Sequence, residues 1–600
     1  MGKQLLMGNE AIALGALRAG VSFAAGYPGT PSSEVLETLA RERADGVYIE
    51  WSVNEKSAME TGAGAAIAGA RVLVTMKQVG LNVASDPLMS LNYVGVKGGF
   101  VVMVADDPGP ISSQTEQDTR HFGRFAKIAV FDPSGPEEAY TMIADAFECS
   151  ERIGRPVIFR PTTRVCHGYA SVTLLDPMPR KAAEGFTRDG GRWVIFPRLA
   201  YTNHIEIERT LAGLSEEFSS YGGNVLSGNG RLGVAAGGVS WSYVCDALTG
   251  VDADCRMLKV ATMPFPARLG EKFLDGVDSV LVVEELDPVI ERELVYLCGK
   301  LGLKAAIKGK LTGDMPNAGE NTPAGVRAAL LNFLGRRGET AESVPKAERP
   351  NLPVRPPVLC AGCPHRASFF AVKQAAKGRK AVFSGDIGCY TLGNAMPLEM
   401  VDTCLCMGAG ITMAQGLHRV EPDAVNFAFI GDSTFFHTGM PGVLNAVYNN
   451  ADVIIAILDN STTAMTGGQP HPGTGQTIMG DGVRKTVIGD VLKALGVEFV
   501  ERVDAFDLAA SKSAIERAMG SPGVRAIIFE GPCIASSRGK GDPCAVNADK
   551  CVGCAACVKN LGCPALSIKD KKAAIDCASC TGCGLCKSLC KFGAIEGGVR

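Results

Sequence analysis

Short apolar runs that stop at polar turns recur along the chain, and this pattern predicts an α/β protein. Two such runs, Phe427–Ile430 and Val453–Leu458, stop at Gly431-Asp432-Ser433 and at Asp459-Asn460, with a helix-like segment between them. Parallel strands joined by a helix end at the same edge of their sheet, and ligands bind in the crevice outside that edge. We therefore expect the side chains of Asp432 and Asn460 to converge.

The same pattern divides the rest of the chain. Phe100–Ala105 and Pro156–Arg160 predict two strands of an N-terminal sheet, the second being its last strand, whereas Leu232–Ala235 and Val280–Val283 predict a second sheet. A single core stops growing near roughly 250 to 300 residues, so we expect several domains in a chain of 600 residues.

Stretches rich in proline and charge are typical of linkers, and two stand out, Pro177–Lys181 and Ala341–Pro357. The expected fold is a set of doubly wound parallel-sheet domains followed by a small cysteine-rich domain. The expected domains span residues 1–180, 190–340, 355–540 and 541–600.

The N-terminal region predicts two helices around a turn. Gly8–Gly20 is expected to form a helix with Asn9 as its N-cap, and the Pro and Gly of Tyr27–Ser33 (YPGTPSS) favour a turn. A later helix, near whose start Glu55 lies, is dominated by Gly and Ala. Side chains this small let another backbone or a flat ligand approach closely.

Charge and hydropathy exclude several classes of protein. The formal net charge of -3 provides no basic field of the kind that nucleic-acid binding needs. No apolar run reaches the roughly 18 residues of a membrane span, and the first residues lack the charged-then-apolar pattern of a secretory signal. We expect a cytoplasmic protein that binds neither nucleic acid nor membrane.

Cysteine placement predicts metal binding in the last 60 residues. Of the 21 cysteines, 10 lie between Cys544 and Arg600, spaced mostly in twos and threes. Disulfides are rare in cytosolic proteins of this size. Clustered cysteines in such a protein therefore indicate a metal site.

The turn at Gly431-Asp432-Ser433, followed by an Asn that ends a strand, resembles the thiamine diphosphate signature. The resemblance implies that Mg²⁺ is bound by the side chains of Asp432 and Asn460 and by the main-chain carbonyl of Thr462. It also implies that Gly431 and Ser433 lie beside the diphosphate. Oxygen ligands are those that Mg²⁺ prefers. Two ordinary α/β turns remain the alternative.

The turn Tyr27–Ser33 and the run Thr466-Gly467-Gly468-Gln469 resemble segments of the 2-oxoacid:ferredoxin oxidoreductases. That resemblance implies that Thr30 lies by the cofactor and substrate. It also implies that Glu55 is the activating glutamate, which hydrogen-bonds N1' of the aminopyrimidine ring. Glu50 and Glu60 are the alternatives to Glu55.

The resemblance also bears on the substrate. It implies that Arg120 or Arg124 binds the substrate carboxylate, because an arginine fork can bind it bidentately. His121, next to Arg120, is equally consistent with a surface histidine. Met465 stands where the pyruvate enzymes of the family carry an Asn near the substrate. An adaptable thioether suits a larger, less polar 2-oxo acid.

In the same family, a Cys-x-Gly-Cys pair, a third Cys about 25 residues on and a distant fourth hold a proximal [4Fe-4S] cluster. The corresponding residues here are Cys360, Cys363, Cys389 and Cys533. Four thiolates suit zinc as well, and a chain in which these residues bind nothing remains a further alternative. His365 is a candidate neighbour of the cofactor. Cys404 and Cys406 lie in an apolar stretch and are expected in the core.

The cysteine-rich tail resembles a bacterial two-cluster ferredoxin, in which the fourth Cys of each run ligates the other cluster. The first cluster would take Cys551, Cys554, Cys557 and Cys590, and the second Cys563, Cys580, Cys583 and Cys586. The first run is longer than usual before its fourth Cys. Cys577 leaves some ambiguity of register, Cys544 is expected to be spare, and zinc is the alternative metal.

Together these features resemble the large, or alpha, subunits of the indolepyruvate:ferredoxin oxidoreductase family. The resemblance implies two thiamine diphosphate-binding domains, a transketolase C-terminal-like domain and a ferredoxin-like tail. The implied reaction is oxidative decarboxylation of aryl-pyruvates with coenzyme A to arylacetyl-CoA and CO₂, with electrons passed through iron–sulfur clusters to ferredoxin. The implied partner is a small beta subunit with a gamma-type domain, in a dimer of alpha–beta pairs.

Two other functions fit part of the pattern. One is a non-redox thiamine diphosphate decarboxylase or synthase whose clusters are structural. The other is an electron-carrying scaffold with a vestigial thiamine diphosphate site, against which the presence of Glu55, Asp432 and Asn460 argues.

Overall fold

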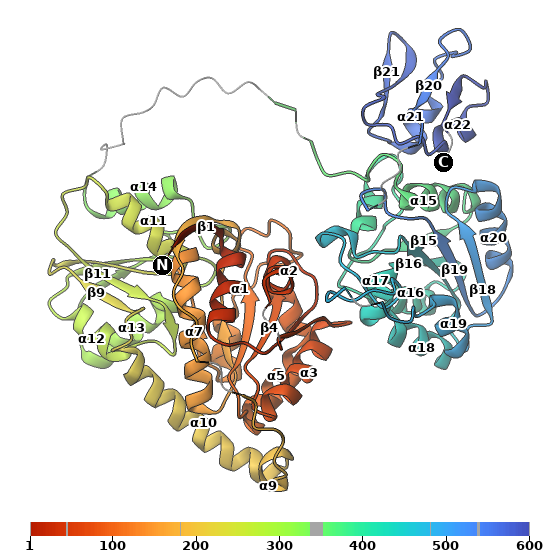
Figure 1. Ribbon diagram of the computed structural model, residues 1–600. Helices are drawn as coiled ribbons and strands as arrows, with labels where there is room; N and C mark the ends of the chain where they lie inside the picture. The colour runs from red at the N-terminus through yellow and green to blue at the C-terminus, as the bar shows by residue number, and fades with distance from the viewer. Residues whose placement is uncertain are drawn as a thin grey trace. The chain divides into compact units, whose positions relative to one another are not determined.

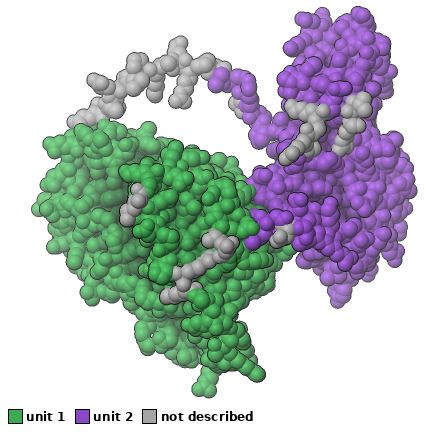
Figure 2. Space-filling model, in the orientation of Figure 1, with its two compact units in different colours: residues 1–349 green, residues 350–600 purple. Residues whose placement is uncertain are grey.

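The computed structural model describes residues 2–43, 46–179, 182–336, 352–353, 355–480, 482–536 and 541–598. The chain forms two compact units, residues 1–349 and 350–600, which Figure 2 shows in green and purple. Arg180 and Lys181 of the first expected linker lie outside the described residues, as does most of the second, Ala341–Pro357. The two units are described separately below.

The larger sheet of the first unit has the strand order β12-β6-β7-β5-β4-β2-β3 among the described residues. In chain order its strands are β2 (Phe23–Gly26), β3 (Tyr48–Trp51), β4 (Val72–Lys77), β5 (Phe100–Ala105), β6 (Val130–Phe131), β7 (Val157–Phe159) and β12 (Thr262–Met263). Neighbouring strands are parallel except for β12, which runs antiparallel to β6.

Helices cover both faces of this sheet (Figure 1). One layer contains α1 (Gly8–Arg18), α2 (Ser33–Glu42) and α7 (Pro136–Ile153), and the other contains α3 (Glu55–Ile67), α4 (Gln78–Val83), α5 (Ser85–Val94) and α6 (Thr119–Ala126). The apolar core between the sheet and the α3 layer is built from residues such as Ala58, Met59, Val74 and Leu88. The doubly wound arrangement expected here is therefore present.

Two local predictions in this region need correction. The strand near Pro156–Arg160 forms as β7, but it is not the last strand of the sheet, because β12 joins the opposite side of β6 about 100 positions later. Asn9 does not cap α1, because Met7 holds that position. Asn9 is instead the second residue of α1. Its buried side chain donates to the carbonyl of Pro31 at 2.7 Å and to Glu34 at 2.8 Å.

The smaller sheet of the first unit has the order β14-β13-β10-β11-β9. Its strands are β9 (Val225–Ser227), β10 (Leu232–Gly237), β11 (Cys255–Val260), β13 (Ser279–Val283) and β14 (Ala306–Lys308), with β9 antiparallel to β11. Helices α11 (Val239–Leu248) and α14 (Pro323–Phe333) pack on one face, and α12 (Ala267–Leu274) and α13 (Val289–Leu301) on the other. Both strands predicted from the sequence for this sheet are confirmed.

The sheet of the second unit is wholly parallel in the order β15-β16-β17-β19-β18. Its strands are β15 (Ala381–Ser384), β16 (Val425–Gly431), β17 (Val453–Asp459), β18 (Phe499–Asp504) and β19 (Val524–Glu530). Helices α15 (Pro364–Ala375) and α20 (Leu508–Gly520) cover one face, and α16 (Ala409–Val420), α18 (Met440–Tyr448) and α19 (Ile488–Ala494) the other.

The cysteine-rich tail contains two short antiparallel strand pairs and two short helices. The elements are β20 (Cys544–Val546), α21 (Ala556–Leu561), β21 (Leu566–Lys569), β22 (Lys572–Ile575), α22 (Leu585–Leu589) and β23 (Ile595–Gly597). Asp570 and Lys571, which join β21 to β22, both have positive φ, as a type I′ hairpin turn requires.

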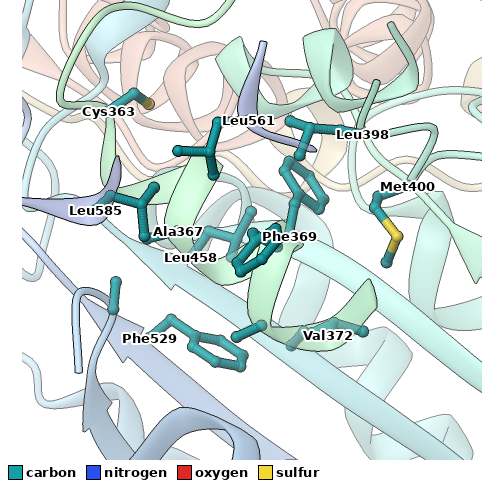
Figure 3. Packing of buried hydrophobic residues seen from close by; sticks show 14 of the residues in the cluster. Cys363, Ala367, Phe369, Val372, Leu398, Met400, Leu458, Phe529, Leu561 and Leu585 are labelled. Carbon is teal, nitrogen blue, oxygen red and sulfur yellow. The ribbon is translucent and has the colours of Figure 1, made fainter. Parts of the chain in front are cut away.

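The tail packs on the parallel sheet domain through one continuous apolar core. Leu561 and Leu585 of the tail belong to the same buried cluster as Ala367 and Phe369 of α15 (Figure 3). The expected α/β class with several mostly parallel sheets is thus confirmed. Among the residues that the structure describes, no helix has the length and apolar composition to cross a bilayer.

Candidate cofactor-binding sites

The carboxyl ends of β16 and β17 bring Asp432 and Asn460 together. The two strands are parallel neighbours, and their register pairs Gly431 with Leu458, so both chains leave the sheet at the same edge. The backbone N–H of Ser461 donates to Asp432 Oδ2 at 2.7 Å, which ties the two turns to each other. The convergence predicted from the apolar runs is confirmed.

Asp432 is buried and held by several donors. Its Oδ1 accepts from the backbone N–H of Ser433 at 2.9 Å, and its Oδ2 lies 3.2 Å from His471 Nε2. Burial by itself would raise the pKa of Asp432, but the hydrogen bond and charge of His471 hold that pKa below its usual range. Asp432 is therefore a carboxylate at neutral pH.

Asn460 is paired with His365, as Asn460 Nδ2 lies 3.2 Å from His365 Nε2. Burial lowers the pKa of His365 to about 4, although the nearby charge of Asp432 acts in the opposite direction. The imidazole is therefore neutral at physiological pH and accepts from the amide. Asn460 Oδ1 accepts from the backbone N–H of Thr462 at 3.3 Å, so His365 does lie beside this site.

The sequence analysis missed two residues at this site. His471 follows the Thr-Gly-Gly-Gln run by two positions, and the signal available was a histidine between two prolines. Tyr390 packs its ring edge against His365, with centroids 5.8 Å apart. A Cβ at Gly431 would lie 2.5 Å from that Tyr390 ring, so glycine is required here by the protein's own packing.

The charges at the β16–β17 edge favour a cation. Burial, followed by the negative charge of Asp432, raises the pKa of Asp459 to about 6. Two carboxyl groups thus adjoin a neutral His365 and an amide. Ser461 adopts a positive φ of 60°, uncommon for a residue other than glycine, and this directs its N–H to Asp432. Carboxylate and amide oxygens placed in this way fit Mg²⁺.

In the first unit, Glu55 is the first residue of α3 and only 6% exposed. Its carboxyl packs against α4 so closely that a Cβ at Gly80 would lie 2.6 Å from Oε1. The two alternative carboxyls have other surroundings than Glu55. Glu60 is half exposed and paired with Lys56. Glu50, on β3, accepts hydrogen bonds from Ser52 and Tyr48. Of the three carboxyls, Glu55 is the most buried.

Lys77 connects Glu55 with the turn that carries Thr30. Burial lowers the pKa of Lys77, and the charges of Asp107 and Glu55 oppose that shift, which shows that both carboxylates lie near the amine. A Cβ at Gly29 would lie 3.2 Å from the Lys77 side chain. The carbonyl of Thr30 accepts from Ser112 Oγ at 3.1 Å, so Thr30 and Glu55 occupy one region of this unit.

Arg120 does not have the role expected of it. The side chain is 2% exposed, and its Nε and Nη2 bind the Asp118 carboxylate at 3.0 and 2.7 Å. Its Nη1 donates to Glu284 at 2.7 Å, and Nη2 also donates to the carbonyl of Glu285 at 2.7 Å. Every guanidinium nitrogen is occupied by the protein itself, so no fork remains for a substrate carboxylate.

The other candidates on α6 lie at the surface. Arg124 is exposed and pairs with Glu293 at 3.2 Å. His121 is partly exposed and lies 3.3 Å from Asp287, as a surface histidine would.

Arg120 belongs to a larger buried ion-pair cluster at the strand ends of the first unit. Arg160 binds Asp106 at 2.7 Å and Asp132 at 3.2 Å. Burial raises the pKa of Asp106 to about 6 against the charge of Arg160. Burial also raises the pKa of Glu285 to about 7, again against Arg160. The cluster joins residues that follow strands of both sheets in this unit.

The four cysteines proposed for a proximal cluster gather near Asn460. Burial raises the pKa of Cys389 to about 11, and the thiols of Cys533 and Cys360 add to that shift. Burial likewise raises the pKa of Cys363 to about 12, with a contribution from Cys360. The backbone N–H of Cys533 donates to the carbonyl of Asn460 at 3.1 Å. The four thiols therefore lie within one region, and Cys533 joins that region to Asn460.

Cys404 and Cys406 contradict the prediction that they lie in the core. Both are exposed, as is Leu405 between them. They belong to the irregular segment that leads into α16, and the apolar stretch there is not part of a helix or strand that faces the sheet.

Two cavities in the tail gather cysteines in the crossed pattern. One is lined by Cys551, Cys554, Cys557 and Cys590, and the other by Cys563, Cys580, Cys583 and Cys586 together with Cys544 of the tail and Cys363 of the sheet domain. Cys563 follows α21 and Cys590 follows α22, so each helix delivers a cysteine to the other run's cavity. Four thiolates per cavity fit a [4Fe-4S] cluster. In the described part of the chain, no three His, Cys, Asp or Glu side chains are arranged as ligands of a single metal ion.

Cys544 and Cys577 differ in their relation to these cavities. Cys577 is exposed and lines neither cavity. Cys544, expected to be spare, is buried and, like Cys363, is a further thiol in the cavity of Cys580 and Cys586. Burial, together with neighbouring thiols, raises the pKa of Cys544. Its position in the sequence gave no signal of this, because it lies 19 positions before Cys563.

Two family models match the chain. Residues 14–192 match the thiamine diphosphate-binding model of pyruvate flavodoxin/ferredoxin oxidoreductases. Residues 386–529 match the C-terminal thiamine pyrophosphate-binding domain of thiamine pyrophosphate enzymes. The first segment contains Thr30 and Glu55, and the second contains Asp432 and Asn460. The chain therefore contains two thiamine diphosphate-binding domains, one matched by each family model.

Relatives with curated names match along nearly the whole chain. The indolepyruvate oxidoreductase subunit IorA of Methanothermobacter thermautotrophicus is 42% identical over 99% of this chain and 97% of the relative. The protein of the same name from Thermococcus kodakarensis is 42% identical over 99% and 96%. A solved 2-oxoglutarate:ferredoxin oxidoreductase from Magnetococcus marinus aligns at a TM-score of 0.45 and 16% identity, over 55% of this chain and 65% of that one.

Proposed function

The chain belongs to the family of indolepyruvate oxidoreductase large subunits, thiamine diphosphate-dependent enzymes of the 2-oxoacid:ferredoxin oxidoreductase class, and on that premise we propose that it oxidatively decarboxylates aryl-pyruvates. Indolepyruvate is the proposed substrate, with arylacetyl-CoA and CO₂ as products. The observation that carries the proposal is that one chain combines the Asp432–Asn460 site with two four-cysteine cavities.

The residues at the β16–β17 edge fit the diphosphate end of the cofactor. Asp432, Asn460 and the carbonyl of Thr462 would hold Mg²⁺. Gly431 and Ser433 would face the phosphates at the start of the helical segment that opens with α17 (Asp432–Thr434). When bound, thiamine diphosphate supplies the electron sink for decarboxylation of a 2-oxo acid.

Glu55 and Thr30 fit the pyrimidine end. The Glu55 carboxyl, buried beside Gly80, would hold a proton at N1' of the aminopyrimidine, which is general acid–base work. Its burial excludes water from that proton. Thr30, on the turn beside Lys77, would lie by the substrate.

The cysteine sets supply the acceptors for the electrons. Each tail cavity would hold one [4Fe-4S] cluster on four thiolates, and Cys360, Cys363, Cys389 and Cys533 would hold a third. The orphaned polar atoms of the second tail cavity, Arg366 Nε and Thr581 Oγ1, fit a group that accepts hydrogen bonds there. External ferredoxin is the proposed final acceptor, and coenzyme A the acyl acceptor.

Met465 supports an aromatic substrate. Its side chain is 52% exposed in the short helical turn η3 (Ala464–Thr466), beside the run that ends at Gln469. A flexible thioether can pack against an indole or phenyl ring, whereas the amide found at this place in pyruvate enzymes favours a small polar substrate.

The relatives are named as subunits of an oxidoreductase, and we propose that this chain is also one subunit of a larger enzyme. The proposed partner is a small beta subunit with a gamma-type domain, in a dimer of alpha–beta pairs located in the cytoplasm. None of this involves nucleic acid or membrane.

An anaerobic assay of the co-expressed subunits tests the proposed function. Methyl viologen reduction is followed with indolepyruvate, phenylpyruvate, hydroxyphenylpyruvate, pyruvate and 2-oxoglutarate, each with and without coenzyme A. We expect fastest reduction with indolepyruvate and dependence of turnover on coenzyme A. Release of CO₂ without viologen reduction would instead support a non-redox decarboxylase.

A further inference from the structure

Two hydrogen-bond donors with no described partner line the cavity of Cys563, Cys580, Cys583 and Cys586, here called cavity two. They are the Nε–H of Arg366 and the hydroxyl of Thr581. Both atoms are buried, and Arg366 as a whole is only 4% exposed. A buried donor left unpaired is costly, so a partner is expected in the working protein.

Arg366 is fixed in place by its other nitrogens. Its Nη1 donates to the carbonyl of Leu561, which ends α21, and its Nη2 donates to the carbonyl of Leu359. These bonds, with a longer one from Nη2 to the carbonyl of Cys360 at 3.5 Å, join the sheet domain to the tail, and Nε is the guanidinium nitrogen for which no partner is described. A side chain anchored at its far end cannot swing away to find water.

Thr581 is fixed by close packing. It lies between Cys580 and Cys583, and a Cβ at Gly362 would lie 2.0 Å from its hydroxyl oxygen. Gly362 adopts a positive φ of 76° in the Cys360–Cys363 turn. The glycine therefore allows the Cys360–Cys363 turn to press against the loop of cavity two. No other described side chain accepts from the hydroxyl.

From these two orphaned donors we infer that Arg366 and Thr581 are positioning residues that donate hydrogen bonds to the sulfur atoms of an iron–sulfur cluster in cavity two and thereby raise its reduction potential. The inference rests on the proposed function, since that function places a cluster there. Hydrogen bonds to cluster sulfurs, nearby positive charge and burial are the protein's means of setting such potentials. Both donors stabilise the more negative, reduced cluster.

The other cavity lacks this arrangement. Its cysteine run begins Cys551-Val552-Gly553-Cys554, whereas the run of cavity two begins Cys580-Thr581-Gly582-Cys583. Val552 therefore occupies the position of Thr581, has no hydroxyl and is 61% exposed. Among the described residues no arginine lines that cavity, and its lining cation, Lys591, is exposed to solvent, which screens its charge. We expect the cluster in cavity two to have the higher potential of the two.

Thr581→Val is the direct test, because the substitution removes the hydroxyl and keeps the shape. The anaerobic holoenzyme is titrated with dithionite at fixed potentials and followed by electron paramagnetic resonance. We expect one cluster transition to move to a more negative potential. The expected size is about a tenfold change in the reduced fraction, or about 59 mV for one electron. The matched control Val552→Thr should leave that transition in place, since residue 552 faces solvent.

Arg366→Lys separates charge from hydrogen bonding. Lysine keeps the positive charge but has no Nε–H donor at that position, so we expect a second negative shift of the same transition. Pulsed electron–nuclear double resonance after exchange into D₂O gives a readout that a merely structural role would not move. Wild type should show an exchangeable proton coupled to the cluster that Thr581→Val lacks.

The outcomes separate this inference from the function on which it rests. Clusters present in normal amount, with an unchanged potential and an unchanged proton coupling in Thr581→Val, would overturn the hydrogen bonds alone. A wild-type chain that binds no iron after anaerobic reconstitution would overturn the tail clusters and this inference together. If Val552→Thr moved the same transition in the same direction as Thr581→Val, the shift would not come from loss of the Thr581 hydroxyl. That result would also contradict the inference.

Discussion

Both units gather charged side chains at the carboxyl ends of their strands, but the two clusters are built differently. In the first unit, Arg120 and Arg160 meet Asp106, Asp118, Asp132 and Glu284, so acids and bases are bound to one another. In the second unit, Asp432 accepts from the backbone N–H groups of Ser433 and Ser461 and lies 3.2 Å from His471, and Asp459 accepts from the backbone N–H and the hydroxyl of Ser461. No arginine or lysine is paired with Asp432 among the described residues.

The partners of these carboxylates distinguish charged groups with a structural role from charged groups that can still bind a ligand. A carboxylate bound bidentately by a buried arginine has little left to offer a ligand. A carboxylate whose donors are backbone N–H groups and an imidazole keeps lone pairs for a cation. By this criterion Asp432 is the better candidate for a cofactor site, whereas Arg120 bonds residues that follow strands of the two sheets of the first unit.

The largest effect is expected where the cation is proposed to bind. Asp432→Asn keeps the shape of the side chain but removes the charge. We expect the Mg²⁺-dependent affinity for thiamine diphosphate to fall by more than about 100-fold, the upper range for residues that only support a ligand, and turnover to be lost. Isothermal titration calorimetry measures the affinity. Unchanged binding would remove Asp432 from the site.

Glu55→Gln tests the pyrimidine side in the first unit. We expect thiamine diphosphate and iron to stay bound while turnover falls by about 10²–10⁴-fold, the range of general acid–base catalysis. Viologen reduction and cofactor content are measured on the same sample. Glu60→Gln is the matched control, since Glu60 is half exposed on the same helix. A normal rate in Glu55→Gln would reject the assignment.

Arg120→Met tests the structural role of the ion-pair cluster. Removing one partner leaves Asp118 and Glu284 buried without their countercharge, which typically costs about 3–5 kcal/mol. Urea unfolding, followed by a spectroscopic signal of the first unit, measures the loss in free energy of unfolding. Arg124→Met, at an exposed arginine on the same helix, should change little. A higher KM at unchanged stability would restore Arg120 as a substrate ligand.

A smaller, pH-dependent effect is expected at Glu285. Burial raises its pKa in the folded protein from 4.5 to about 7, so the folded state binds more protons than the unfolded state between these values. Stability should therefore fall as the pH rises from about 4.5 to 7. The full loss is about 3 kcal/mol. Glu285→Gln should remove this slope, as seen in unfolding free energies at pH 5 and 8; an unchanged slope would contradict the assignment.

The sequence was sufficient to predict contacts that follow from the periodicity of apolar residues. The apolar runs placed β5 and β17, and the strand ends placed Asp432 near Asn460. Both follow from the regular geometry of strands. The resemblance to two-cluster ferredoxins, rather than spacing alone, placed each run's last cysteine in the other cavity.

Prediction failed where a distant part of the chain decides the environment. Arg120 binds Glu284, 164 positions away, and this partner cannot be read from the helix on which Arg120 lies. Asn9 resembles an N-cap but is drawn into the core by Pro31 and Glu34. Thr581 packs against Gly362 of another loop, and the cysteine spacing does not reveal that contact.

The central claim is that this chain couples decarboxylation of an aryl 2-oxo acid to reduction of its own clusters. The direct measurement is rapid freeze-quench electron paramagnetic resonance of the anaerobic, reconstituted enzyme mixed with indolepyruvate, together with the CO₂ released. We predict that reduced-cluster signals appear along with CO₂ in wild type and that neither appears in Glu55→Gln. Release of CO₂ by wild type while every cluster stays oxidised would contradict the claim.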